Sequence, residues 1–416
     1  MGTSDRTGNA PSNGSNEPGR LGLWLVGARG SIATCVVYGL FGLKEGLLEP
    51  VGLVTETGPL ARLPLRRFDR IVVGGHEIAR GDLSHAAAEL VQNGVLDREL
   101  VTAGANEAAR YDERVRSGLL DEADLGSGNL DPEAVRRSGE LPRRQVEELA
   151  GDIERFRAEN QLERVVVCCV SSTEAYRELA ESAGDLASFE EALDAGASFP
   201  ASSLYAYAAL RAGAPFVNFT PNAGASPPAL RELAKRVHLP HCGNDAKTGE
   251  TLLKTALAPV FVARALRVLS WQGYNMLGNA DGRSLSDPIR QEAKLRTKDH
   301  VLKDILGGGP HTGVGIDYVP SLHDWKTAWD FVHFEGFLGA RMSLQFTWMG
   351  CDSALAAPLV LDLARLADFA AACGESGPMD HTACFFKSPL SGGTHDFHRQ
   401  FGRLLAYAER HLADSP

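Results

Sequence analysis

Two apolar runs predict strands that are buried on both faces. Leu21–Val26 and Arg164–Val170 consist mainly of apolar residues and lack the alternation of a strand with one exposed face. Such runs are typical of a parallel sheet that helices cover on both sides. After the first run come a short turn, Gly27–Ser31, and a helical pattern from about Ile32 to Leu40. The folded part of the chain is therefore expected to begin with a strand, a turn and a helix.

The turn between this strand and helix contains Gly27 and Gly30. Glycines let the backbone approach a pyrophosphate, and the amides of a helix N-terminus favour its negative charge. The usual dinucleotide fingerprint has a further glycine, where this chain has Leu25 and Val26. By itself the segment fits either a nucleotide site or a plain strand–turn–helix unit.

Two more strands are predicted before residue 80. Val51–Thr55 would end at Glu56, which is either a ribose ligand or an exposed loop acid. Arg70–Val73 would close on a pair of glycines that ends at Gly75. Glycines at the carboxyl end of a parallel strand permit close approach of a ligand, although an ordinary turn explains them equally well.

Residues 82–160 are polar and are expected to be mainly helical, and alternation of strands and helices resumes after them. Arg164–Val170 ends in the hydroxyl-bearing Ser171–Thr173, which would face a ligand crevice or cap the next helix. The next elements expected are helix Ser202–Ala212, strand Phe216–Asn218, helix Pro228–Val237 and strand His238–Cys242. This alternation predicts a doubly wound α/β sheet.

The pattern changes near residue 244, where we expect a domain boundary. Gly243–Gly249 should open a long helix, with Asp245 as its cap and Lys247 in its first turn. Lys326 is expected in a loop, Pro320–Lys326. The other elements expected are strands Leu269–Leu277, Val314–Val319 and Met342–Trp348, helices Ala354–Ala371 and His395–Ala413, and a strand-like run at Cys384–Lys387.

Composition narrows the class of protein. The chain has 416 residues, 44% hydrophobic and 23% charged, which is ordinary for a globular protein of two or three domains. A net charge of −11 argues against nucleic acid as the main partner, and no apolar run is long enough to span a membrane. Seven scattered cysteines without a CxxC spacing indicate reduced thiols and a cytoplasmic protein. Residues 1–20 are rich in Gly, Ser, Asn and Pro, which predicts a disordered tail and no signal peptide.

Lysine is rare and clustered. Of 42 basic residues only nine are Lys, and six of these lie between Lys247 and Lys326. A lysine can be tuned to give up its proton, whereas arginine cannot. Lys294 and Lys298 would share one face of a helix that begins near Ser286, after a turn at residues 278–282. The cluster indicates either proton transfer and anion binding, or a solvated basic face.

Several segments together resemble one family, the inositol-1-phosphate synthases. The similarity runs from about Leu21 to Pro389, and it is faint in the first 160 residues and strong after Pro200. Besides the Lys294/Lys298 pair, the matching segments are PASSLYAYAAL, GNDAKTGETLLK, YNMLGNADGRSLS, DYVPSLHDWKTAWD and CDSALAAPLVLDL.

This resemblance implies a fold and an activity. The fold would be a Rossmann-type NAD-binding domain, residues 21–243 with about 352–416, and an inserted α+β catalytic and oligomerisation domain at 244–351. The protein would be a homotetramer that converts glucose 6-phosphate to inositol 1-phosphate. In the implied cycle C5 of the sugar is oxidised by NAD, a proton leaves C6, the enolate closes the ring on C1, and C5 is reduced again. The sequence leaves open whether a divalent or monovalent cation assists.

The resemblance also assigns residues, position by position. The implied catalytic residues are Lys294, Lys298, Lys326, Lys387, Asp281 and Asn275. The implied cofactor contacts are Gly27, Ala28, Arg29, Gly30, Ser31, Gly75, Ser171, Ser172, Thr173, Asp245, Asn279, Asp352 and Ser353.

Other positions depart from the family pattern. His76 and Glu77 replace Trp and Asp, Ser172 replaces Asn, Ala280 replaces Asn, and Cys351 replaces Glu. These departures fall on residues of the pocket, so they bear on the identity of the substrate more than on the type of reaction. The same cycle on fructose 6-phosphate would give a five-membered carbocycle. A simple NAD-dependent dehydrogenase and a non-catalytic NAD-binding protein remain as alternatives. Neither alternative explains why all four lysines are kept at the implied catalytic positions.

Overall fold

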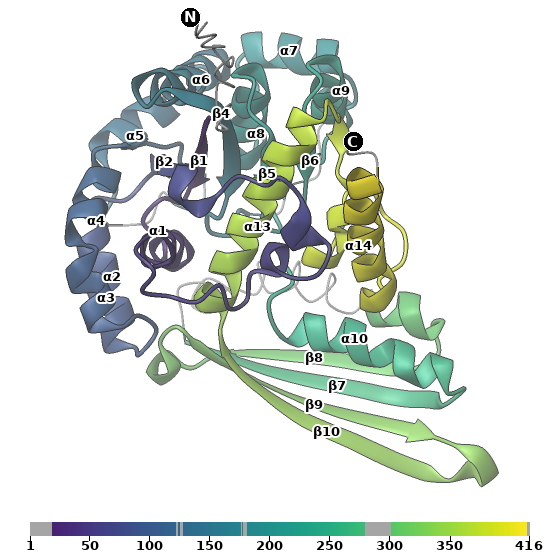
Figure 1. The fold of residues 1–416 in the computed structure, drawn as a ribbon. Helices are drawn as coiled ribbons and strands as arrows, with labels where there is room; N and C mark the ends of the chain where they lie inside the picture. The colour runs from purple at the N-terminus through teal and green to yellow at the C-terminus, as the bar shows by residue number, and fades with distance from the viewer. Residues whose placement is uncertain are drawn as a thin grey trace, which may run out of the picture.

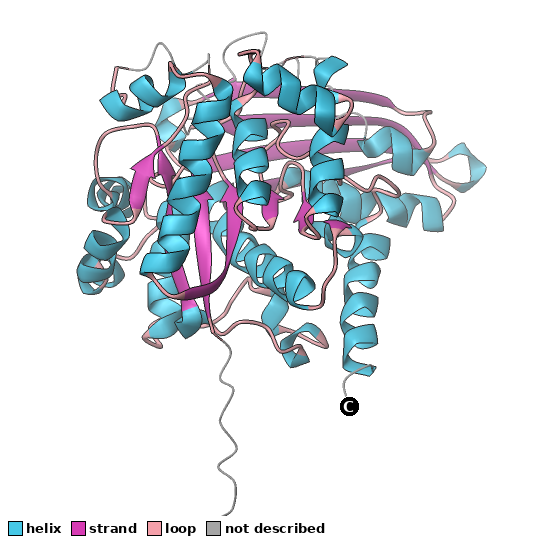
Figure 2. Cartoon of the chain, turned by 90° about the horizontal axis from the view of Figure 1, so that it is seen from above, coloured by secondary structure: helices cyan, strands magenta, loops and turns pink. Residues whose placement is uncertain are grey.

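The computed structural model describes residues 19–121, 124, 128–175, 177, 181–278 and 301–413. Two sheets organise these residues, a parallel sheet surrounded by helices and a longer four-stranded sheet at one end of the molecule (Figures 1 and 2). The tail expected at residues 1–20 lies almost wholly outside the described residues. No helix among the described residues is long and apolar enough to cross a membrane.

The larger sheet has the strand order β11-β6-β5-β4-β1-β2-β3, and every pairing in it is parallel. Apart from β11 this is the order of a Rossmann sheet, so the predicted doubly wound fold is confirmed. Its strands are β1 (Arg20–Val26), β2 (Ile71–Glu77), β3 (Val115–Ser117), β4 (Leu162–Cys169), β5 (Phe216–Asn218), β6 (Pro240–Cys242) and β11 (Gly377–Pro378).

Strand β1 shows why its sequence lacks alternation. Leu21, Leu23 and Leu25 belong to a core on one side of the sheet, and Trp24 and Val26 belong to a second core on the other side. Both faces of the strand are thus buried. The first core is covered by α1 (Ser31–Lys44), α2 (Leu83–Gln92), α13 (Asp352–Ala372) and α14 (Phe397–Ala413), and the second by α6 (Pro142–Glu159), α7 (Leu186–Asp194), α8 (Ala201–Arg211) and α9 (Pro228–Arg236). Shorter helices are α3 (Arg98–Ala103), α4 (Ala105–Asp112) and α5 (Pro132–Ser138).

The second sheet has the order β10-β9-β7-β8. One face packs on α10 (Glu250–Ala263), and Figure 1 shows no helix of the described residues against the opposite face. On that opposite face Trp329, Phe331 and His333 form a stacked row. The strands are β7 (Arg267–Leu277), β8 (His311–Tyr318), β9 (Trp325–Glu335) and β10 (Arg341–Cys351).

Two predictions in the first 80 residues are wrong. Val51–Thr55 is not a strand: Val54–Glu56 is a short 3-10 helix, and the amides of Val54 and Thr55 donate to the Asp362 carboxylate instead of to a neighbouring strand. Gly75 does not follow a strand but lies within β2.

Three predictions in the second half are also wrong. Helix α10 begins at Glu250, so Asp245 does not cap it and Lys247 is not in its first turn. Lys326 was expected in the loop Pro320–Lys326, but it lies in strand β9, where it pairs with Leu277 and Gly350. Residues Asp380–Phe385 form a 3-10 helix, and the strand-like run keeps only a single bridge, from Phe386 to Ala246.

Candidate active site

The turn after β1 brings the backbone close to the end of β4. Gly27 has a φ of +91°, and a Cβ there would lie 2.9 Å from the Cα of Ser171. The Gly27 amide donates to the carbonyl of His76 at 2.9 Å, which fixes the turn against β2. A residue with a side chain would be strained here and would push the two strand ends apart.

Helix α1 starts at this turn with an N-terminus that can receive an anion. Gly30 is its N-cap and supplies no side-chain cap, and the first turn contains no acidic residue. Gly30 and Ser31 line the cavity that opens in front of the helix. The free amides and the helix dipole suit one phosphate group of a dinucleotide.

The acid beside this turn is Glu77, at the end of β2. Its Oε2 accepts from the Arg29 amide at 2.7 Å and its Oε1 from the Ile78 amide at 2.7 Å. The end of the strand next to β1 is where Rossmann folds carry the ribose-binding acid. Glu56, the candidate from sequence, instead accepts from Arg365 Nη1 at 2.6 Å.

Two pockets meet at these strand ends. Both are lined by Gly30 and by Ser171–Thr173, one extending toward β2 and the other toward the four-stranded sheet. An extended dinucleotide fits such a pair, with its phosphates at α1. The pocket that extends toward β2, the first of the two, is lined by two arginines and six acids. These are Arg29 and Arg80, and Glu77, Asp82, Glu89, Asp121, Asp124 and Glu174. This negative lining favours a ribose with a free 2′-hydroxyl over one with a 2′-phosphate.

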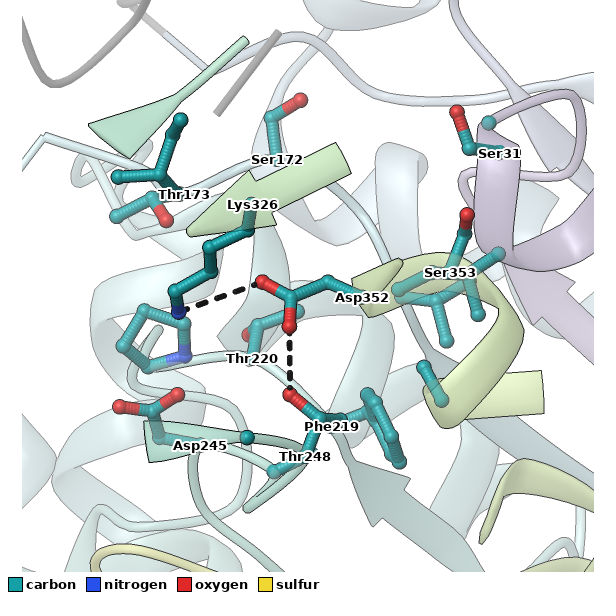
Figure 3. Close-up of a pocket in the computed structure, with 18 of the residues that line it drawn as sticks. Ser31, Ser172, Thr173, Phe219, Thr220, Asp245, Thr248, Lys326, Asp352 and Ser353 are labelled. Carbon is teal, nitrogen blue, oxygen red and sulfur yellow. Dashed lines mark hydrogen bonds and ion pairs between the residues drawn. The ribbon is translucent and has the colours of Figure 1, made fainter. Parts of the chain in front are cut away.

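The second pocket contains two of the predicted lysines, Lys326 and Lys387, and Figure 3 shows Lys326 beside Asp352. Lys326 Nζ lies 3.6 Å from Asp352 Oδ2, and the Thr248 hydroxyl donates to Asp352 Oδ1 at 3.1 Å. Strand β9 supplies Lys326, and Asp352 is the first residue of α13. The second sheet and the Rossmann part thus meet at this carboxylate.

Lys387 reaches the same pocket from the C-terminal segment. Its Nζ donates to Asp245 Oδ1 at 2.7 Å, and its backbone amide donates to the Asp245 carbonyl at 2.7 Å. Lys247, whose amide donates to Phe385, joins the same two segments. Asp245 and Lys387 are 142 residues apart in the sequence, so only the fold brings these two side chains together.

A buried carboxylate that the sequence did not single out lies between the starts of α1 and α13. Asp324 accepts from the Ser353 hydroxyl and, at 3.1 Å, from the Cys351 thiol. Burial raises its pKa above the usual value, and the hydrogen bonds from Ser353, Cys351 and Ser31 oppose that rise. Asp324 thereby holds Ser31 and Ser353, two of the predicted cofactor contacts.

The N-terminus of α10 is a further part of the pocket that the sequence reasoning missed. Thr248, Gly249, Glu250 and Thr251 all line the cavity, and Gly249, as N-cap, supplies no side-chain cap. A Thr-Gly-x-Thr segment at a helix start offers hydroxyls and free amides to an anion. The signal was present in the sequence, but the helix was expected to begin too early.

The structure gathers most predicted residues and separates a few. Gly30, Ser31, Ser171, Ser172, Thr173, Asp245, Lys326, Asp352, Ser353 and Lys387 line one pocket. Ala28 is fully buried in the core, and Gly75 packs against β1, where a Cβ would lie 2.9 Å from the Cβ of Ala28. Asn275 lies on β7 and is fully buried, and within the described chain neither polar atom of its side-chain amide has a hydrogen-bond partner. Lys294, Lys298, Asn279 and Asp281 lie outside the described residues.

No group of three His, Cys, Asp or Glu side chains in the described ranges could hold a metal ion. All seven cysteines fall within these ranges and are free thiols.

The Rossmann sheet, the uncapped α1 and the lysine pocket define an NAD-binding enzyme that acts on a small anionic substrate. The family model described as myo-inositol-1-phosphate synthase matches residues 21–408, and the chain belongs to this family of cyclising isomerases. The resemblance found in the sequence is thereby confirmed.

Relatives support this assignment. Inositol-3-phosphate synthase 1 of Bacteroides thetaiotaomicron is 35% identical over 409 residues, which cover 92% of this chain and 91% of the relative. Inositol-3-phosphate synthase isozyme 1 of Arabidopsis thaliana is 28% identical, with 93% of this chain and 79% of the relative covered.

Solved structures show the same fold. The inositol-3-phosphate synthase of Caenorhabditis elegans matches with a TM-score of 0.84 at 24% identity, covering 94% of this chain and 86% of that one. A myo-inositol-1-phosphate synthase-related protein from Thermotoga maritima matches with a TM-score of 0.76 at 25% identity, covering 94% and 98%.

Proposed function

We propose that the protein cyclises glucose 6-phosphate to myo-inositol 1-phosphate, with NAD as a catalytic cofactor that is regenerated in each cycle. The observation that carries this proposal is the shared pocket. The α1 turn, the α10 N-terminus, Lys326 and Lys387 all open into one cavity. Oxidation, ring closure and reduction on one bound sugar require these parts side by side.

In this proposal the α10 N-terminus binds the phosphate of the substrate. The amides after Gly249 and the hydroxyl of Thr251 are the donors on this side of the pocket, because the Thr248 hydroxyl already donates to Asp352. Anchoring the phosphate would place the sugar carbons toward Lys326 and Lys387. The hydroxyl-bearing carbons of the sugar, C5 among them, would then lie between the two lysines and the α1 side of the pocket.

Lys326 and Lys387 would hold and move protons at the sugar oxygens. Each lies beside a carboxylate, Asp352 and Asp245 respectively, which orients the ammonium group. Ammonium groups that are largely buried and fixed in place stabilise the negative charge that develops on oxygen during enolisation and ring closure. The resemblance adds Lys294, Lys298 and Asp281 to this set.

Bound NAD⁺ would supply the acceptor for a hydride from C5 and later return it. The chain would hold this cofactor by the α1 amides, the Gly27–Ser31 turn, the Ser171–Thr173 strand end and Ser353. Glu77 would accept hydrogen bonds from the ribose hydroxyls.

The outer face of the four-stranded sheet supports a homotetramer. On that face Tyr274, Trp329 and Met349 are each 40% or more exposed, which is unusual for large apolar side chains of a sheet. We propose that this face pairs with a second copy, through an inserted domain at residues 244–351. Light scattering at micromolar concentration tests this, and a monomer would contradict it.

The reaction is tested by incubating the protein with glucose 6-phosphate or fructose 6-phosphate and catalytic NAD. Phosphorus and carbon NMR should show inositol phosphate from glucose 6-phosphate with no accumulation of NADH. Stoichiometric NADH would indicate a simple dehydrogenase instead. A five-membered carbocycle from fructose 6-phosphate would replace the proposed substrate but retain the cycle.

A further inference from the structure

Three charged side chains meet in the space between α10 and the four-stranded sheet. Lys254 Nζ lies 2.6 Å from Glu250 Oε1 and 3.3 Å from Asp330 Oδ1. Trp271 Nε1 donates to the same Asp330 oxygen at 2.7 Å. Glu250 and Lys254 are each 2% exposed and Asp330 is fully buried, and we refer to these three residues as the buried triad.

A glycine in the sheet leaves room for the buried triad. Gly273 of β7 pairs with Asp330 of β9. A Cβ at Gly273 would lie 2.5 Å from Glu250 Oε1, 2.6 Å from Lys254 Nζ and 3.1 Å from Asp330 Oδ1. The three charged groups therefore converge on one point above the Gly273 backbone. Glycine ordinarily weakens the middle of a strand, and it often marks a place where another group approaches closely.

Such a triad is not explained by stability alone. Removing two carboxylates and an ammonium group from water is costly, and apolar residues of similar volume often serve a fold equally well. Its position suggests another role, since Glu250 is the first residue of α10 and lines the pocket. An acid in the first turn is favoured by the helix dipole, but it competes with an anionic ligand for the same end of the helix.

We propose that Lys254 is a positioning residue that keeps the α10 N-terminus receptive to phosphate. Its ammonium group draws the Glu250 carboxylate one turn down the helix, toward Asp330, and neutralises its charge. Asp330, held by Trp271, fixes Lys254 in that place. This inference rests on the proposed phosphate site. It says that phosphate binding at this site depends on Lys254, which does not itself touch the substrate.

The test compares four variants of the full chain loaded with NAD. Lys254→Met, Glu250→Gln, the double variant and Lys235→Met are titrated with inorganic phosphate and with glucose 6-phosphate by calorimetry. Lys235 is an exposed lysine on α9 and serves as the control. Lys254→Met should raise both dissociation constants and the KM by about tenfold or more, because an uncompensated carboxylate then faces the phosphate. The kcat should change far less than KM, and the NAD affinity should stay the same.

The double variant carries the decisive result. Removing the Glu250 charge together with Lys254 should return phosphate binding to within about threefold of the unmodified protein, since the carboxylate at the helix N-terminus is gone and the remaining one, Asp330, does not line the pocket. Double-variant binding as weak as that of Lys254→Met would overturn the inference.

Glu250→Gln keeps the shape of the site and decides the matter if Lys254→Met does not fold. Phosphate should bind this variant as tightly as the unmodified protein or more tightly. Binding weakened tenfold would mean that Glu250 itself supports the anion, and would refute the role given to Lys254. A failure of the unmodified protein to bind phosphate at all would reject the phosphate site and this inference with it.

Discussion

Replacing Lys387 with methionine separates the chemical role of its amine from its structural role. The ammonium group lies 2.7 Å from Asp245, and the two side chains are 17% and 9% exposed. Breaking a fully buried ion pair costs about 3–5 kcal/mol, and losing an exposed one costs at most about 1 kcal/mol. This pair lies between those limits, so we expect Lys387→Met to lower the free energy of unfolding by roughly 2 kcal/mol.

The effect on turnover should be much larger. Loss of a general acid or base typically costs about 10²–10⁴ in rate, and we expect at least a hundredfold fall for Lys387→Met. The companion variant Lys387→Met/Asp245→Asn leaves no unpaired charge. It should therefore recover most of the lost stability while its turnover remains low.

Two measurements check this reasoning. Urea unfolding followed by circular dichroism gives the stability of the single and double variants, and phosphorus NMR gives conversion of glucose 6-phosphate. Turnover of Lys387→Met within threefold of the unmodified protein would refute the role of the amine. Recovery of turnover in the double variant would show that the defect was a stranded carboxylate and not a missing proton donor.

Three further predictions concern the cofactor turn, its acid and a buried lysine. Gly27→Ala should weaken NAD binding, measured by nicotinamide fluorescence, and destabilise the fold by about 1–3 kcal/mol; Gly46→Ala is the matched control, since Gly46 also has a positive φ but no atom within contact of a Cβ. Glu77→Gln should reduce the preference for NAD over NADP, measured as the ratio of the two dissociation constants, and an unchanged ratio would contradict the proposed ribose contact. Burial lowers the pKa of Lys247 from 10.5 to about 8, so the unfolded chain binds more protons between these values and stability should rise with pH by about 3 kcal/mol in total. Urea unfolding of Lys247→Met at pH 7 to 10.5 should lack this rise relative to the unmodified protein, and parallel curves for the two proteins would refute it.

Much of the fold could be predicted because burial on both faces leaves a clear pattern. The runs Leu21–Val26 in β1 and Val165–Cys169 in β4 contain no polar side chain, and β5 was expected with the bounds that it has. The errors arose where a tertiary contact replaces the regular pattern. Residues 54–55 satisfy their amides on the Asp362 carboxylate, which comes 307 residues later in the chain, and no local signal reveals that.

The sequence by itself determined the type of sheet, the glycine turn and an unusual concentration of lysine. Those features depend on local conformation and on residue chemistry, both of which are written in short segments. Only the tertiary structure decided which groups act together. It placed Lys387 on Asp245, joined Lys326 to the first residue of α13, paired Glu56 with Arg365, and set Glu77 beside the Gly27–Ser31 turn. It also brought Lys254, Glu250 and Asp330 together above Gly273. Ion pairs of this kind act over a few ångströms. The packing of α10 and α13 against the sheets decides which residues come within that distance, and the separation of these residues along the chain does not.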